Sequence, residues 1–316
     1  MQRRDVIVLS TAPWLAPSLR AQGQDRGWRL VVGFPPGTGP DVVARTLAQK
    51  LGPQVVVDNR TGAGGQIAAQ AVAKGAADGS QVLLGEVGSI AIAPAAYTRL
   101  PYDPARELVA LTEVVRSDFV LVAPASTPTR DVAAFVAAAR GQRDRINVAT
   151  FGAGTPGHFA AELFGDMAGF KVEPVHYRAT GDAISALIAG DVKAAFVSTA
   201  LAMAQVQGGR LVALATTAPT RSAQLPQVPT FTEAGYPKMD VSAWFALFVP
   251  AATPEVQQEA LARQAGAALQ AADLRQTLQQ AGFTVVGGSR ADAERLVRAE
   301  AQRWAAVVKA TGFKGD

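Results

Sequence analysis

The chain has 316 residues, of which 49% are apolar and 18% are charged. These values exclude a disordered or fibrous chain and are typical of about two globular domains. The chain has no cysteine and only two histidines, His158 and His176, which excludes disulfides, thiolate zinc sites, cysteine nucleophiles and a His-rich metal site. The net charge is +4, and no Lys/Arg run follows the first 21 residues, so we expect no nucleic-acid partner.

The first 21 residues have the pattern of an export signal. Arg3 and Arg4 form a charged start, a short apolar stretch follows up to Leu15, and Ala21 offers a small residue for cleavage. The apolar part is too short to span a bilayer, and an arginine pair in this place is typical of the twin-arginine route. We therefore predict a periplasmic protein that is cleaved near Ala21. The alternative is a cytosolic protein with a frayed N-terminus.

Beyond the signal, short β-branched runs alternate with Ala-rich stretches of helical spacing. The β runs occur at 28–32, 55–57, 82–84, 119–122 and 146–149. Strands that alternate with helices are typical of an α/β fold with mostly parallel sheets. No later segment reads as a transmembrane helix.

One strand–loop–helix unit occurs twice along the chain. Residues 34–38 (FPPGT) open one predicted helix, and residues 151–155 (FGAGT) open another, each directly after a β run. The offset between the two is too long for a solenoid repeat and indicates two similar α/β lobes.

Two long β runs, at 114–124 and 241–250, have the pattern of crossover strands between these lobes. We therefore predict that residues 22–124 and 241–316 form lobe 1 and that residues 125–240 form lobe 2.

A glycine-rich loop before a helix exposes unpaired backbone N–H groups at the positive end of the helix dipole, which suits an anion. Such loops are predicted at 34–38, 60–66 and 151–155. If the lobes face each other, the amides of loops such as those at Gly37 and Gly154 would grip a small carboxylate from both sides. The alternative is that the glycines only form tight βα turns.

Two other chemistries compete for the second loop. Gly152 to Gly157 has the spacing G-x-G-x-x-G, with Glu173 further on, which is the pattern of an NAD(P)-dependent oxidoreductase. Its glycine spacing differs from that of the first loop. His158 and Glu162 stand one helical turn apart and could hold a metal, but no third ligand is evident. We therefore predict no catalytic residues, no metal and no cofactor.

Several segments together resemble the Bug family, the extracytoplasmic solute-binding receptors of tripartite tricarboxylate transporters. The resemblance rests on 34–37 with Asp41, and on 58–65, 100–104, 152–162, 221–235 and 242–245. It covers roughly residues 28–312. It implies a two-lobed periplasmic-binding-protein fold with the ligand cleft between the lobes.

The resemblance also implies a function. A non-catalytic receptor would capture a small organic acid and deliver it to the membrane permease subunits of a tripartite tricarboxylate-type transporter. A receptor that feeds a membrane signalling sensor is the alternative. We expect a monomer, and the ligand stays open among dicarboxylates, tricarboxylates, aromatic acids, amino acids and other solutes.

In the family the ligand carboxylate is held by backbone amides, hydroxyls and water. Carried over to this chain, the ligand-binding candidates are Phe34, Gly37, Thr38, Gly39, Gly64, Gly65 and Ser89 in the first lobe, and Thr150, Gly152, Gly154, Thr155, His158, Tyr177 and Arg178 in the second. Pro40, Ala153, Ala179 and Val197 depart from the family's pattern, and they leave the ligand-selecting end of the pocket undetermined.

The export signal gives the first prediction. We expect the protein in the periplasmic fraction, with a mature N-terminus close to Gln22, because the charged start and short apolar stretch direct export and cleavage. Cell fractionation followed by N-terminal sequencing measures this. A cytosolic protein that retains Met1 would contradict it.

Overall fold

The computed structural model describes residues 27–177 and 179–315, so the predicted export signal and Arg178 lie outside the described residues. Three parallel strands with intervening helices form one end of the sheet, in the order β2-β1-β3. They are β1 (Trp28–Val32), β2 (Val55–Asn59) and β3 (Gln81–Glu86). Helices α1 (Gly39–Leu51) and α2 (Gln66–Ala73) connect them, as expected for parallel neighbours.

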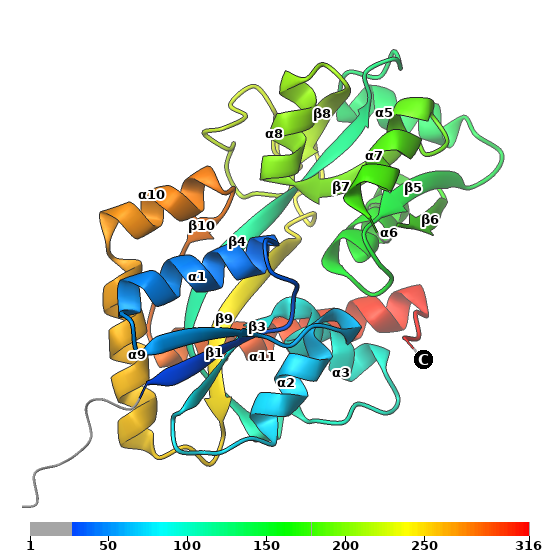
Figure 1. Ribbon diagram of the computed structural model, residues 1–316. Helices are drawn as coiled ribbons and strands as arrows, with labels where there is room; N and C mark the ends of the chain where they lie inside the picture. Colours follow the sequence, from blue (N-terminus) through cyan, green and yellow to red (C-terminus); the bar gives the residue numbers. More distant parts are fainter. Residues whose placement is uncertain (1–26, 178, 316) are drawn as a thin grey trace, which may run out of the picture.

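A single long strand joins the two lobes. The first part of β4 (Leu108–Pro124) runs antiparallel to β9 (Ser242–Pro250), from the pair Leu108–Pro250 to the pair Asp118–Ser242. From Phe119 onward β4 pairs instead with β7 (Ala194–Ser198) and β8 (Leu211–Thr216). Figure 1 shows the two lobes one above the other, with β4 running from the lower lobe into the upper one and β9 beside its lower part.

The second lobe continues from β7 through parallel pairs with β5 (Ile146–Thr150) and then β6 (Val172–His176). The short strand β10 (Thr284–Val285) pairs with β4 at the edge of the first lobe. The sheet order is therefore β2-β1-β3-β9-β4-β7-β5-β6, with β8 and β10 also on β4. The predicted two-lobed α/β fold is confirmed.

The remaining helices flank these strands (Figure 1). They are α3 (Ala93–Ala96), α4 (Pro104–Glu107), α5 (Val132–Arg140), α6 (Pro156–Ala168), α7 (Thr180–Ala189), α8 (Thr199–Gln207), α9 (Glu255–Leu269), α10 (Ala272–Gln280) and α11 (Arg290–Thr311), with the short turns η1 (Ala63–Gly65) and η2 (Gly88–Ile92). Among the described residues, no helix is both long enough and apolar enough to cross a membrane.

The carboxyl ends of both parallel groups face the junction between the lobes. β3 ends at Glu86, beside the start of β9, where Ser242 pairs with Asp118. In the second lobe β7 ends at Ser198, which pairs with Phe119, the next residue of β4. Because parallel neighbours end at the same edge of a sheet, the loops after β1, β2 and β3 lie across the junction from those after β5, β6 and β7.

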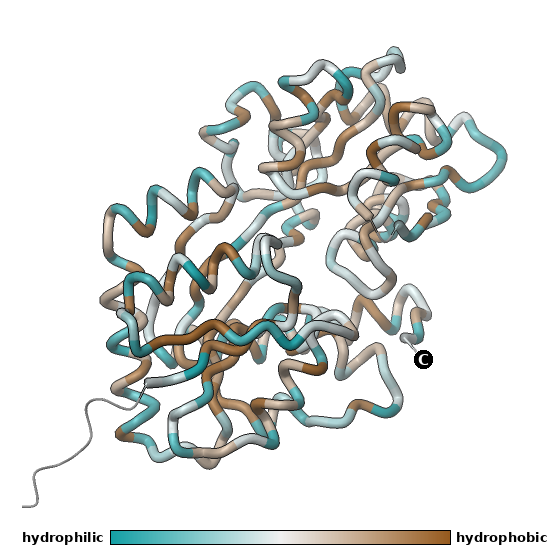
Figure 2. The backbone as a smooth tube through the Cα atoms, in the orientation of Figure 1, coloured by the Kyte–Doolittle hydropathy of each residue, from teal (hydrophilic) through white to brown (hydrophobic). Residues whose placement is uncertain are grey.

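Apolar side chains cover both faces of the sheet. In Figure 2 the hydrophobic colour is concentrated in the strands. One core lies under α1, where Val43 and Leu47 are fully buried at helical spacing. Another core continues from one lobe into the other, because Phe159 of α6 packs against Trp304 of α11 with ring centroids 5.5 Å apart. Helix α11 is therefore an apolar bridge between the lobes.

A single carboxylate fixes this bridge to the crossing strands. The indole Nε1 groups of Trp244 on β9 and Trp304 on α11 donate to the same oxygen, Oε2 of Glu300, at 3.0 and 2.9 Å. Both indoles are buried. Arg303 lies 3.4 Å from the other oxygen of Glu300, so the charge of the carboxylate is partly balanced.

The Glu300 anchor gives the second prediction. Glu300→Ala should lower the free energy of unfolding by about 2–5 kcal/mol, because it leaves two buried indole N–H groups without an acceptor at about 1–3 kcal/mol each. Urea denaturation measures the loss. Glu294→Ala, on the same helix but in exposed ion pairs, is the control and should change stability by less than about 0.5 kcal/mol. Equal losses in the two variants would contradict the anchor.

Candidate functional site

The loops that open α1 and α6 share one hydrogen-bonded construction. The backbone N–H of Gly37 donates to Oδ2 of Asp41 at 2.9 Å, and that of Gly154 donates to Nδ1 of His158 at 3.1 Å. Each acceptor is the third residue of its helix. Gly37 and Gly154 have φ values of +81° and +72°, a region that favours glycine. The repeat seen in the sequence therefore extends to the geometry of the loops.

These hydrogen bonds change which backbone amides are available to bind a carboxylate. The amides of Gly37 and Gly154 are already engaged by side chains, so they are not free donors in this conformation. Within the described residues, the N–H groups of Gly39 and Thr155, at the starts of α1 and α6, have no acceptor. The amides of Asp41 and Gly157, in the same first turns, also have no acceptor among the described residues. The helix dipole at these starts favours an anion.

Asp41 holds the first loop in place. Its carboxylate accepts from Nε of Arg45 at 2.9 Å and from Nδ2 of Asn59 at 2.8 Å, and Asn59 also donates to the carbonyl of Phe34. Burial alone would raise the pKa of Asp41, but the bonds from Arg45, Gly37 and Asn59 outweigh it and lower that pKa. The loop is thereby tied to the end of β2. Sequence reasoning listed Asp41 only as part of a motif and missed this role.

Three ligand-binding candidates of the first lobe, Phe34, Gly65 and Ser89, lie side by side and form one surface, here called the first-lobe wall. The Cβ that Gly65 lacks would lie 3.6 Å from the ring of Phe34 and 3.5 Å from Oγ of Ser89. A Cβ on Gly33 would lie only 2.5 Å from Cα of Gly65, so the first and second loops touch at two glycines. Gly64, next in the same turn, has open space around it and a φ of +59°.

Glu86 lies beside this wall and was not among the sequence candidates. It ends β3, and the hydroxyl of Ser89 donates to its carbonyl at 3.2 Å. Burial raises the pKa of its carboxyl to about 7, against the opposing effect of a hydrogen bond from the Gly88 amide. An acid near the end of a strand carries no distinctive sequence signal, because its neighbours come from other loops.

In the second lobe the candidate side chains mainly shape the loop. Oγ1 of Thr155 accepts from the His158 amide at 3.4 Å and donates to the Gly152 carbonyl at 2.8 Å. Thr150 hydrogen-bonds Nδ1 of His176 through its hydroxyl and accepts from the Tyr177 amide through its carbonyl. These contacts connect the ends of β5 and β6 to the start of α6.

His158 is a buried structural side chain. Because Nδ1 accepts the Gly154 amide, the ring proton of the neutral form sits on Nε2, which lies 3.5 Å from Glu162. Its ring packs edge-on against His176 at 4.9 Å, and burial, followed by the charge of His158, lowers the pKa of His176. The part of the chain that the structure describes has no group of three His, Asp or Glu side chains arranged for a metal.

The C-terminal segment is a contact that sequence reasoning missed. The ring of Phe313 lies 5.3 Å from that of His158, and a Cβ on Gly154 would come within 3.1 Å of it. Nearby, the Gly315 amide donates to the carbonyl of Ala96 in α3. The segment after α11 thus touches both lobes.

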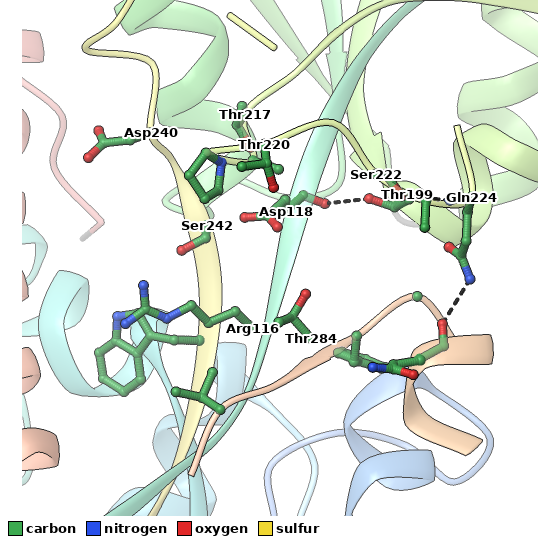
Figure 3. Close-up of a pocket in the computed structure, with 18 of the residues that line it drawn as sticks. Arg116, Asp118, Thr199, Thr217, Thr220, Ser222, Gln224, Asp240, Ser242 and Thr284 are labelled. Carbon is green, nitrogen blue, oxygen red and sulfur yellow. Dashed lines mark hydrogen bonds between the residues drawn. The ribbon is translucent and has the colours of Figure 1, made fainter. Parts of the chain in front are cut away.

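A separate cleft of about 940 Å³ lies between the lobes at the β10 edge of β4. Figure 3 shows Arg116, Asp118 and Ser242 on the crossing strands, and Gln224 reaching across to donate to the Gln279 carbonyl in α10. None of the candidate residues lines this cleft. The repeated loops lie elsewhere, at the carboxyl ends of the parallel strands, where open α/β sheets commonly bind ligands.

The Asp41 network gives the third prediction. Asp41→Asn should lower the free energy of unfolding by about 1–3 kcal/mol at pH 7, because a neutral amide at this buried position cannot accept all the bonds from Gly37, Arg45 and Asn59. A lowered pKa stabilises the folded state above the ordinary value of 3.8, and this contribution is lost as the pH falls through the folded-state pKa. The gap between wild type and variant should therefore close in acid.

Denaturation curves at pH 7 and in acid measure this gap. Asp144→Asn, at an exposed position, is the matched control. A variant as stable as this control at pH 7 would contradict the role of Asp41.

Most of the chain is similar to known proteins. Residues 41–313 match the model of the "Tripartite tricarboxylate transporter family receptor". The chain is 33% identical to Protein BugT of Bordetella pertussis over 313 residues, which cover 98% of this chain and 96% of BugT.

Two solved structures share the fold. Rpa4515 of R. palustris, solved with adipate, is 31% identical with a TM-score of 0.82, covering 92% of this chain and 99% of that one. The periplasmic binding protein BugD is 27% identical with a TM-score of 0.78, covering 91% and 98%. Given the family match over most of its length and the two-lobed fold, the chain belongs to the tripartite tricarboxylate transporter receptors, the Bug family that its motifs resemble.

Proposed function

We propose that this protein captures a small organic carboxylate between its lobes outside the cytoplasm and delivers it to the permease subunits of a tripartite tricarboxylate-type transporter. The observation that carries the proposal is the pair of matching helix-opening loops on opposite sides of one junction, each with an open N–H donor. The adipate in the solved R. palustris relative supports a carboxylate as the ligand class.

The proposed ligand site consists of the residues predicted from the sequence, but some of them have roles that differ from the predicted ones. Gly39 and Thr155 supply backbone donors, while Gly37 and Gly154 give the loops their shape. Phe34, Gly65 and Ser89 form the first-lobe wall. The other candidates are Thr38, Gly64, Gly152, Tyr177 and Arg178, which complete the proposed binding site, and the buried Thr150 and His158, which hold its second-lobe loop in shape. Hydrogen bonds to a charged group of about 1.5–3 kcal/mol each, with dipole terms of about 0.3–1 kcal/mol, suffice for the roughly 8 kcal/mol of a micromolar complex.

We propose that the two lobes move as rigid bodies relative to each other. Lobe 1 comprises residues 22–124 and 241–316, and lobe 2 comprises residues 125–240. The exchange of strand partners in β4 between Asp118 and Phe119 supports a hinge there, within the last part of the lobe 1 segment. Binding closes the lobes around the ligand, as in other hinged binding proteins.

We also propose that the protein is exported and acts in the periplasm. BugD is a periplasmic binding protein, which supports the same compartment for this chain. The leader would be cleaved near Ala21, with the twin-arginine route suggested by Arg3 and Arg4. The mature protein acts as a monomer without catalysis or cofactor.

The fourth prediction tests ligand capture and closure together. In a thermal-shift screen of organic acids, at least one acid should raise Tm, because a ligand at a hundred times its Kd adds about 2.7 kcal/mol to native stability. Small-angle scattering with that acid should show a smaller radius of gyration than without it. The uncharged amide of the same acid is the control and should do neither.

Two results would contradict this proposal. One is a screen in which only a nicotinamide dinucleotide shifts Tm. The other is an acid that binds without any change in the scattering curve, which would exclude lobe closure.

A further inference from the structure

The residues after α11, 312–315, form a C-terminal arm that is fixed at both of its ends. At its start, Oγ1 of Thr311 accepts from the Phe313 amide at 3.4 Å. At its other end, the Gly315 amide donates to the carbonyl of Ala96 in α3 at 2.8 Å. Because α11 also packs on α3 and η2, the arm belongs to the first lobe.

The anchor at the end of the arm requires a glycine. A Cβ on Gly315 would lie 2.5 Å from the ring of Tyr97, so the backbone of the arm lies directly on that ring. Tyr97 follows the last residue of α3, whose carbonyl accepts the Gly315 amide. A larger side chain at this position would push the arm away from α3.

Between these two ends, the ring of Phe313 packs on the start of α6 in the second lobe. It stands edge-on to the rings of His158 and Phe159, with ring centroids 5.3 and 5.4 Å away. A Cβ on Gly154 would come within 3.1 Å of the same ring. Edge-on aromatic contacts are favourable beyond the apolar area that they bury. The first lobe therefore contacts the helix-opening loop of the second lobe through one side chain.

His158 is the side chain that gives this loop its shape. Its Nδ1 accepts from the Gly154 amide at 3.1 Å, which requires one orientation of the imidazole ring. Phe313 lies against that ring, and His176 packs on it with centroids 4.9 Å apart. The amide of Thr155, the next residue after Gly154, is one of the proposed ligand donors. An imidazole that turned away would release the Gly154 amide and displace this donor.

The corresponding loop of the first lobe is supported from within its own lobe. There the Gly37 amide donates to Asp41, and a Cβ on Gly39 would lie 3.0 Å from the ring of Phe283. Phe283 directly precedes β10, which pairs with the first-lobe part of β4. Both loops thus have a phenylalanine ring against a glycine, but only the second-lobe loop takes its ring from the C-terminal arm.

From these contacts we infer that Phe313 is a positioning residue of the ligand site. It holds His158, and through it the Gly154 loop, in the shape that binds a carboxylate. This inference rests on the proposed carboxylate-binding function. Phe313 acts through His158 and not on the ligand, so the shape of the second-lobe loop depends on an arm of the first lobe.

Amide exchange tests the loop without any ligand. Each of the Gly154 and Gly37 amides has one side-chain acceptor, so Gly37 is an internal reference in the other lobe. In Phe313→Ala of the mature protein, NMR should show at least tenfold faster solvent exchange of the Gly154 amide, because local opening becomes easier. Exchange at Gly37 should stay as in wild type. Phe313→Leu keeps apolar bulk and should restore most of the protection.

Two further variants test the anchor of the arm. In Gly315→Ala the added methyl group meets the Tyr97 ring and displaces the arm while Phe313 is unchanged, so exchange at Gly154 should again become faster. Lys314→Ala removes an exposed side chain of the same arm and is the matched control. It should leave the exchange of both glycine amides unchanged.

Calorimetry then measures the consequence for binding. Succinate, glutarate and adipate are titrated into wild type, Phe313→Ala and Lys314→Ala. An acid that binds wild type should bind Phe313→Ala at least fivefold more weakly, because the loop must then be ordered at the expense of binding. The same acid should bind Lys314→Ala with the Kd of wild type.

Three results would overturn the inference. The first two are unchanged exchange at Gly154 in Phe313→Ala and equally faster exchange at Gly154 and Gly37, since neither is a local effect on the loop. The third is an acid whose Kd is the same in wild type and in a Phe313→Ala variant with a loosened loop. If Gly154 exchanges faster in that variant and no acid of the panel binds wild type, the loop contact is supported and the proposed function fails on these probes.

Discussion

The architecture depends on one strand that belongs to both lobes. Residues 108–118 of β4 pair with β9 and residues 119–124 pair with β7 and β8, so the hydrogen-bond ladder continues through the junction without a flexible linker. This continuity fixes which ends of the parallel strands face each other. It also restricts relative motion of the lobes to changes around the residues where the partners change. The position of the two helix-opening loops follows from this constraint.

The two helix-opening loops are held in shape by the chain itself. In each loop a side chain from the first helical turn takes up the amide of the preceding glycine, through Asp41 in one lobe and His158 in the other. The loop is ordered by the chain itself, so less conformational entropy remains to be lost on binding. The two lobes use chemically different acceptors, a charge-stabilised carboxylate and a buried imidazole, for the same geometric purpose.

The alternating pattern and the internal repeat were enough to predict the fold class, because hydrophobic periodicity and glycine placement are local properties. The meeting of Phe34, Gly65 and Ser89 followed from the family resemblance. What the sequence could not show is which acceptor an amide finds, as at Gly37 and Gly154, since that depends on loop geometry. The contact of Phe313 with the second lobe joins chain segments that are distant in sequence. Periodicity carries no information on such contacts.

The carboxylate shared by Trp244 and Trp304 has an optical consequence. An indole's emission depends on the charges and hydrogen-bond partners around it. Both of these indoles donate to Glu300, and the ring of Phe159 from the other lobe packs at a tilt against that of Trp304. A rotation of the second lobe that displaces Phe159 changes the surroundings of Trp304 directly. Trp304 is thus a built-in fluorescent reporter of the position of the second lobe relative to α11.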